Sequence, residues 1–133
     1  MPSEESLSRN FKVEIVHLIL SKQTEEALKK LSEAYGVAVP DLHVGLPKGH
    51  VRTAYGTYNA KNQTISVLDS DVFGNPFVIL HEFYHHLRSR SVDRQHHGTE
   101  KNADKFALDF LREFQLAAIE AAASQKHSDP LEK

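Results

Sequence analysis

Apolar and polar residues along this chain predict a strand, a helix, further strands and then two helices. At residues 11–20 (FKVEIVHLIL), alternation and β-branched residues favour a strand, and a helix merged with the next segment is the alternative interpretation. Residues 22–35 repeat apolar positions at helical spacing, and Gly36 follows where a helix C-cap belongs, so they predict a helix. Residues 42–46 predict a strand, and PKG at 47–49 predicts a turn.

The rest of the chain predicts a hairpin and two helices. VRTAYGTY at 51–58 and TISVL at 64–68 predict two paired strands, and the turn-rich residues 69–76 predict a loop. Helices are predicted over about 76–90, which begins with proline, and about 99–123. This order indicates an α+β domain. The predicted buried stripe of the last helix consists of Phe106, Leu108, Phe110, Leu111, Phe114 and Ile119.

Length and composition limit the classes of protein that fit. The 133 residues suit one domain spanning 1–133, with flexible tails expected at 1–10 and 124–133. The net charge of −2 lacks the basic excess of a nucleic-acid binder. The absence of cysteine excludes thiolate ligands, so a zinc site must use His, Asp or Glu. The apolar stretch at 13–20 is too short to span a bilayer and the N-terminus is polar, so we expect a cytoplasmic protein.

Residues 81–85 (HEFYH) carry the strongest chemical signal in the chain. On a helix, His81 and His85 lie one above the other on one face and can present two imidazole nitrogens to one metal ion. Glu82 lies off that axis, where it can reach a metal-bound water, as a general base must. The uncharged residues around the motif suit a buried site. The alternative interpretation is that the two histidines only cap a helix or pack in the core. This interpretation explains less well why two histidines and a glutamate occur at this spacing among uncharged residues.

A catalytic site needs a third protein ligand. The metzincin extension requires glycine at position 88 and histidine at position 91, and this chain has Arg88 and Ser91, so that class is excluded. His96 and His97 are alternatives, either as ligands or as groups that bind substrate at the rim. Solvated loop histidines are the simpler interpretation of this pair.

The predicted helix at 99–123 offers a better third ligand. Glu100 lies in its first turn, and Asp104 follows four residues later on the same face. Glu100 can bind zinc while Asp104 accepts a hydrogen bond from a ligand imidazole, as zinc-binding histidines usually require. A favourable interaction with the helix dipole would explain Glu100 alone, but not its pairing with Asp104. Two neutral imidazoles and a carboxylate suit Zn²⁺.

Two stretches of the chain together resemble the gluzincin metallopeptidases: HEFYH at 81–85 and EKNADKFA at 100–107. The second stretch is similar to the ImmA/IrrE-type peptidases, and the small size resembles the single-domain minigluzincins. GTY at 56–58 and ISV at 65–67 look like the strand pair that precedes the zinc helix in that group. The resemblance covers roughly residues 51–111.

The resemblance implies a zincin-like minimal domain with a small, mostly antiparallel sheet, a backing helix, an HExxH active-site helix and a glutamate helix. Asp104 would support a ligand histidine, and Glu82 would activate the zinc-bound water that hydrolyses a peptide bond. A peptide or protein substrate would bind as an extended strand along residues 64–68, with no nucleic-acid or membrane partner. The implied zinc ligands are His81, His85 and Glu100.

Larger gluzincins stabilise the oxyanion with a tyrosine or histidine from a second subdomain. We expect no such subdomain here, because little chain follows Glu100 and most of it is predicted helix. This gap leaves a second hypothesis, a zinc-binding regulatory or latent module with little or no catalytic activity. The sequence leaves the oligomeric state open. The candidates for the oxyanion role are Tyr55, Tyr58, Tyr84, His96 and His97.

Overall fold

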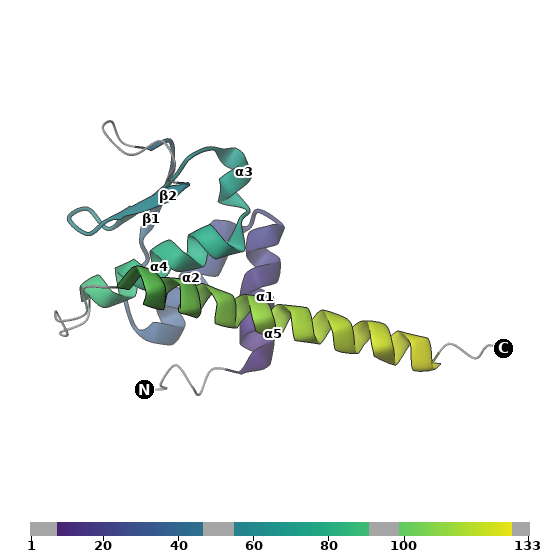
Figure 1. Ribbon diagram of the computed structural model, residues 1–133. Helices are drawn as coiled ribbons and strands as arrows, with labels where there is room; N and C mark the ends of the chain where they lie inside the picture. Colours follow the sequence, from purple (N-terminus) through teal and green to yellow (C-terminus); the bar gives the residue numbers. More distant parts are fainter. Residues whose placement is uncertain (1–7, 47–54, 91–98, 129–133) are drawn as a thin grey trace.

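The computed structural model describes residues 8–46, 55–90 and 99–128 (Figure 1). These ranges form an α+β fold of five helices and a small three-stranded mixed sheet. The helix α4 packs against the sheet and against α5, whose last part extends beyond the other elements. The elements in chain order are α1 (Arg9–Leu20), α2 (Thr24–Tyr35), β1 (Asp41–Val44), β2 (Gly56–Asn59), β3 (Thr64–Val67), α3 (Ser70–Phe73), α4 (Pro76–Arg90) and α5 (Thr99–Ser128).

The predicted strand at 11–20 is wrong, because this segment forms the helix α1. Ser8 caps α1 by accepting a hydrogen bond from the Phe11 N–H at 3.1 Å. The helix packs between α2 and α5, so its buried side chains follow helical spacing: Ile15, Val16 and Ile19. It does not merge with α2, because Lys22 adopts a φ of 62° between the two helices.

Most other predicted elements are confirmed in type. The helix predicted at 22–35 is α2, and Gly36 ends it with a φ of 72°. The helix predicted at 76–90 is α4. The predicted loop at 69–76 contains the short helix α3, capped by Asp69. The predicted turn at 47–49 lies outside the described residues.

The last helix differs from its prediction in length and in its buried face. It was expected to end near residue 123, but α5 continues to Ser128, into the segment predicted as a tail. Phe106 and Phe110 are buried as expected. Leu108 and Ile119 are 53% and 64% exposed, so their predicted burial is wrong. Leu108 lines an open pocket together with Leu20 of α1 and Pro76 of α4, so it borders the helix contacts without being enclosed by them.

The sheet has the order β1–β3–β2 and is mixed, not mostly antiparallel. The strand β3 pairs in parallel with β1 and antiparallel with β2, where Gly56 lies opposite Val67. The next residue, Leu68, donates its N–H to the Tyr55 carbonyl at 2.8 Å. Both edges of β3 are therefore occupied. The prediction that a substrate pairs with residues 64–68 is wrong for this reason, since strand addition needs a free edge.

A single hydrophobic core fixes α4 between the sheet and the other helices. Three phenylalanines of this core come from α4 and α5: Phe83, Phe106 and Phe110. The rings of Phe83 and Phe106 stack with centroids 6.5 Å apart, and Phe106 and Phe110 are 5.1 Å apart. Within the described ranges, no helix has the length and apolar character needed to cross a membrane.

Candidate metal centre

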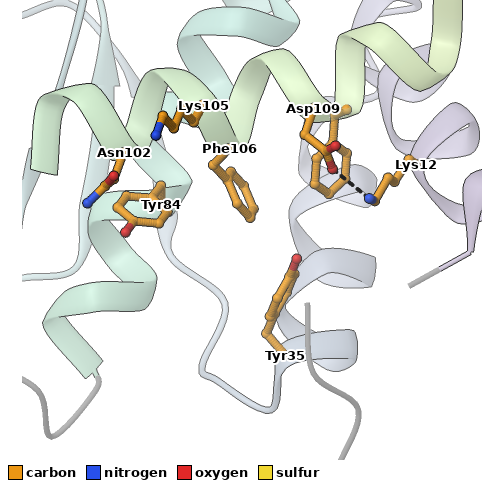
Figure 2. A pocket seen from close by; sticks show the side chains of 8 residues that line it. Lys12, Tyr35, Tyr84, Asn102, Lys105, Phe106 and Asp109 are labelled. Atoms are coloured by element: carbon orange, nitrogen blue, oxygen red, sulfur yellow. Dashed lines mark hydrogen bonds and ion pairs between the residues drawn. The ribbon is translucent and has the colours of Figure 1, made fainter. Parts of the chain in front are cut away.

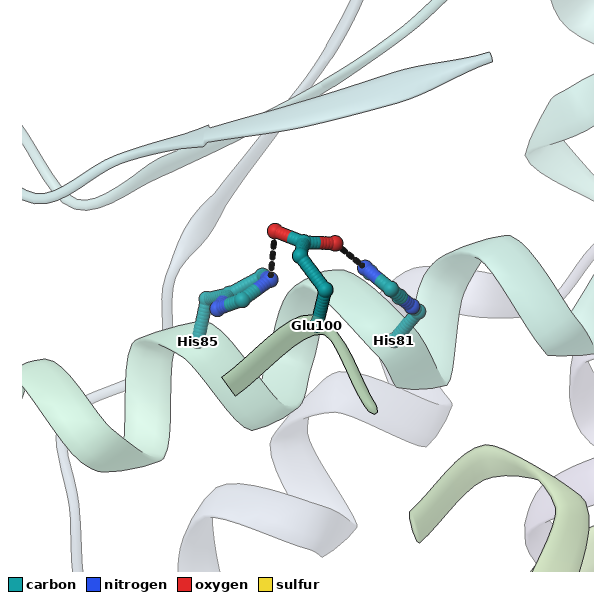
Figure 3. A group of neighbouring side chains, drawn as sticks. All are labelled: His81, His85 and Glu100. Atoms are coloured by element: carbon teal, nitrogen blue, oxygen red, sulfur yellow. Dashed lines mark hydrogen bonds and ion pairs between the residues drawn. The ribbon is translucent and has the colours of Figure 1, made fainter. Parts of the chain in front are cut away.

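His81 and His85 extend from one face of α4 toward Glu100 in the first turn of α5 (Figure 3). The Glu100 carboxylate contacts both imidazoles: Oε1 lies 2.8 Å from His81 Nε2, and Oε2 lies 3.2 Å from His85 Nε2. One ligand atom from each residue lies within 4.8 Å of the other two. Ligand atoms around a tetrahedral zinc ion are about 3.3 Å apart, so small side-chain movements suffice for this group to hold a metal ion.

Asp104 holds one imidazole in the orientation that a metal requires. Its Oδ1 lies 2.9 Å from His81 Nδ1, one helical turn beyond Glu100. A carboxylate only accepts hydrogen bonds, so His81 Nδ1 carries the hydrogen. His81 Nε2 faces a carboxylate as well, Glu100 Oε1 at 2.8 Å. A metal ion held here would take the lone pair of Nε2, while Asp104 keeps the hydrogen on Nδ1. The structure therefore brings together Glu100 and Asp104 as the sequence predicted, and it identifies His81 as the partner of Asp104.

The environments of the two histidines favour metal ligation. The His81 and His85 side chains are only 14% and 19% exposed, whereas the Glu100 side chain is 79% exposed. Burial lowers the pKa of His85, although the charge of Glu100 opposes this effect. A neutral imidazole is the form that binds metal. The group is therefore enclosed on the α4 side and open to solvent on the Glu100 side.

Glu82 is buried beside this group, with 7% of its surface exposed. Burial raises its pKa to about 7, because desolvation penalises the charged carboxylate; His81 opposes the effect and Glu100 adds to it. The strand β2 passes close to the same side chain. A Cβ atom added to Gly56 would lie 3.4 Å from Glu82 Cγ and 2.7 Å from Val78 Cγ1. Glycine at this position therefore allows β2 to approach the helix that carries Glu82.

A second pair of side chains links β2 to α4, and the sequence did not single it out. The Tyr58 hydroxyl lies 2.6 Å from Nδ1 of His86, which is fully buried. His86 Nε2 lies 2.7 Å from the Ala38 carbonyl oxygen. One signal was present: His86 is four residues after Glu82 and therefore lies on the helix face that looks toward the sheet.

None of the three candidate tyrosines directs its hydroxyl to the metal group. The Tyr58 hydroxyl contacts His86, as described above. Tyr84 lines a separate pocket of about 270 Å³ beside the Lys12–Asp109 ion pair (Figure 2). Tyr55 is 62% exposed. Side chains alternate along a strand, and a side chain at Gly56 would face α4, so the Tyr55 side chain points to the opposite face. The other two candidates, His96 and His97, lie outside the described residues.

Comparison with protein-family models, with curated proteins and with solved structures finds no match to this chain. The interpretation of the site therefore depends on the residues and on their geometry. The gluzincin resemblance contributes an expected ligand set and an expected reaction.

Proposed function

We propose that this protein is a zinc-dependent metallopeptidase that hydrolyses peptide bonds. The observation that carries the proposal is the convergence of two helical histidines and a glutamate from the next helix, with a buried carboxylate beside them. Asp104, behind His81, supplies the outer contact that zinc-binding histidines usually have. This arrangement supports hydrolysis more directly than a purely structural zinc site, which has four protein ligands.

The donor set fits zinc. Two imidazole nitrogens and one carboxylate leave a fourth position free, as in catalytic zinc sites. His81, His85 and Glu100 would hold the ion. When bound, zinc supplies a Lewis acid that polarises the substrate carbonyl and makes water acidic near neutral pH.

Glu82 provides the proton transfer in this proposal. Its carboxylate accepts a proton from the attacking water and later donates it to the amine that leaves. In the metal-free protein, burial raises the pKa of Glu82 to about 7. A cation bound beside it would lower that pKa and favour the carboxylate, which is the form that accepts a proton. Burial prevents bulk water from competing for this carboxylate.

We further propose that the substrate binds along the outer edge of β2, which replaces the predicted site along 64–68. Within the described ranges, no strand pairs with this edge. Leu68 donates its N–H to Tyr55, so Tyr55 bonds to the β3 side. In an antiparallel pair this direction alternates, and the N–H and C=O groups of Gly56 and Tyr58 therefore point outward. An extended peptide pairs with such groups by strand addition.

Glu82→Gln tests the catalytic assignment. The variant keeps all three ligands, so it should bind one zinc ion per chain but lose hydrolysis of fluorescein-labelled casein by at least about 100-fold. Zinc content and rate are measured on the same samples, with Glu33→Gln, an exposed change on α2, as control. Cleavage by Glu82→Gln at the wild-type rate would show that Glu82 is not the base.

A zinc-binding module with little catalytic activity is the second candidate. The position of the tyrosines favours it, because within the described ranges no tyrosine hydroxyl is directed to the place where an oxyanion would form. Stoichiometric zinc binding, without hydrolysis of casein or of a broad panel of peptides, would select this candidate over the peptidase.

A further inference from the structure

We propose that Tyr58 and His86 are positioning residues that hold the substrate-binding edge of β2 at a fixed height above α4. This inference rests on the proposed function, because it concerns where a peptide lies relative to the metal group. It assigns a role to a buried histidine and a tyrosine hydroxyl that the hydrolytic chemistry does not use.

The directions of the two hydrogen bonds follow from their partners. The Ala38 carbonyl oxygen can only accept, so His86 Nε2 donates to it at 2.7 Å. In the neutral ring the other nitrogen, Nδ1, has a lone pair and accepts from the Tyr58 hydroxyl at 2.6 Å. Three segments are joined in this way: the loop between α2 and β1, the active-site helix α4 and the edge strand β2. The Tyr58 hydroxyl also lies 3.3 Å from the Ser89 hydroxyl, which donates to the His86 carbonyl at 2.9 Å, so the shorter bond of Tyr58 is the one to His86.

The position of Tyr58 along β2 connects this bond to the substrate. Its backbone N–H and C=O point to the outer edge of β2, where the peptide is proposed to pair. Two residues earlier, Gly56 lies against Glu82 and Val78. Because Glu82 and His86 are one helical turn apart, β2 is held to α4 at two points along the same helix face. Gly56 sets how close the strand lies, and the Tyr58–His86 bond keeps it there.

His86 is also packed as a rigid anchor. It is fully buried, and its ring meets Tyr58 edge-on, with centroids 5.3 Å apart. The Phe83 ring lies 5.7 Å from it on the core side. A buried side chain held on several sides transmits the position of α4 to the strand above it. Loss of the Tyr58 hydroxyl leaves a buried nitrogen without that partner and releases the strand.

Tyr58→Phe tests the proposal, with Tyr84→Phe as matched control. Both variants remove one tyrosine hydroxyl, but Tyr84 lines the pocket away from β2. With fluorescein-labelled casein, Tyr58→Phe should raise KM about tenfold with kcat within about twofold, because it weakens binding that ground state and transition state share. Zinc content and the kinetics of Tyr84→Phe should stay at wild-type values. An unchanged KM, or a lower kcat at unchanged KM, would overturn the proposal.

Variants of His86 separate positioning from a general loss of packing. His86→Gln keeps one group that can donate to Ala38 and one that can accept from Tyr58, so its KM should stay within about threefold of wild type. His86→Leu keeps the volume without either bond and should raise KM as Tyr58→Phe does. Equal KM values for the two His86 variants would contradict the positioning role. Nitrogen NMR of the His86 ring detects the Tyr58–His86 hydrogen bond directly, because the chemical shift of Nδ1 should change in Tyr58→Phe.

Binding without cleavage distinguishes a failure of this proposal from a failure of the proposed function. In the Glu82→Gln background, Tyr58→Phe should weaken binding of the same casein, measured by fluorescence anisotropy, about tenfold. If wild type cleaves nothing but this loss is seen, positioning is supported and the peptidase assignment fails. If wild type cleaves but Tyr58→Phe has no effect, positioning alone is overturned. If casein is neither bound nor cleaved, both are overturned.

Discussion

Replacement of Glu82 by glutamine should make the metal-free protein more stable, while removing its proposed activity. The folded chain buries this carboxylate, and the resulting desolvation raises its pKa from 4.5 to about 7. Glutamine fills nearly the same volume without a charge to desolvate. A substitution that stabilises the protein and also abolishes its activity is expected where the original residue is retained for catalysis at a cost in stability.

The size and pH range of the effect follow from the two pKa values. Below pH 4.5 the carboxyl is protonated in folded and unfolded chains alike, so its ionisation does not lower the free energy of unfolding. Between pH 4.5 and about 7 the unfolded chain ionises first, and the wild type loses stability as the pH rises. Above pH 7 the wild type has lost the full amount, about 3 kcal/mol in the free energy of unfolding. This figure is the rise in the pKa of Glu82 multiplied by about 1.4 kcal/mol per pKa unit.

Urea unfolding in the presence of a chelator measures this difference. Metal-free Glu82→Gln should exceed wild type by about 3 kcal/mol at pH 8.5, and the gap should narrow steadily as the pH falls to 5. The two proteins carry the same histidines and differ only at residue 82, so the comparison isolates Glu82. The exposed Glu33→Gln change should give a gap below about 0.5 kcal/mol at both pH values. Equal stability of wild type and Glu82→Gln at pH 8.5 would refute the burial cost assigned to this carboxylate.

Two further predictions concern the contacts around the site. Asp104→Asn should weaken zinc binding about 10–100-fold in competition with a chelator, because His81 loses its carboxylate partner. Asp109→Asn is the control: it lies on the same helix but pairs with Lys12, so it should bind zinc as wild type does. Equal zinc affinities for wild type and both variants would contradict the role of Asp104. Gly56→Ala should cost about 1–3 kcal/mol in urea unfolding, since the new Cβ meets Val78 Cγ1 at 2.7 Å. Val78→Ala in that background should recover part of the loss, and a cost below about 0.5 kcal/mol would show that β2 is free to move away.

The site could be predicted from the sequence because its geometry is local. His81 and His85 are one helical turn apart, and so are Glu100 and Asp104. Fixing two helices therefore fixes two pairs of side chains, and only one packing step is needed to bring the pairs together. That step, the contact between α4 and α5, placed Glu100 against both imidazoles and Asp104 against His81.

The errors in the fold come from contacts that spacing along the chain does not encode. Residues 11–20 contain both strand-like alternation and helical spacing, and the neighbouring helices α2 and α5 decide for the helix. The position of β3 in the sheet depends on a parallel pairing with β1 across more than twenty residues. The link between Tyr58 and His86 spans 28 residues and needs the sheet to be in place first. Such partners are chosen by packing, not by local pattern.

A crystal structure of the zinc-loaded protein, with the metal located by its anomalous signal, would show whether His81, His85 and Glu100 bind one zinc ion. We expect one tetrahedral ion about 2.0–2.2 Å from Nε2 of His81, Nε2 of His85 and a Glu100 carboxylate oxygen. The fourth position should face solvent beside Glu82. An ion bound to His96 or His97 in place of Glu100, or a fourth protein ligand that closes the site, would contradict it.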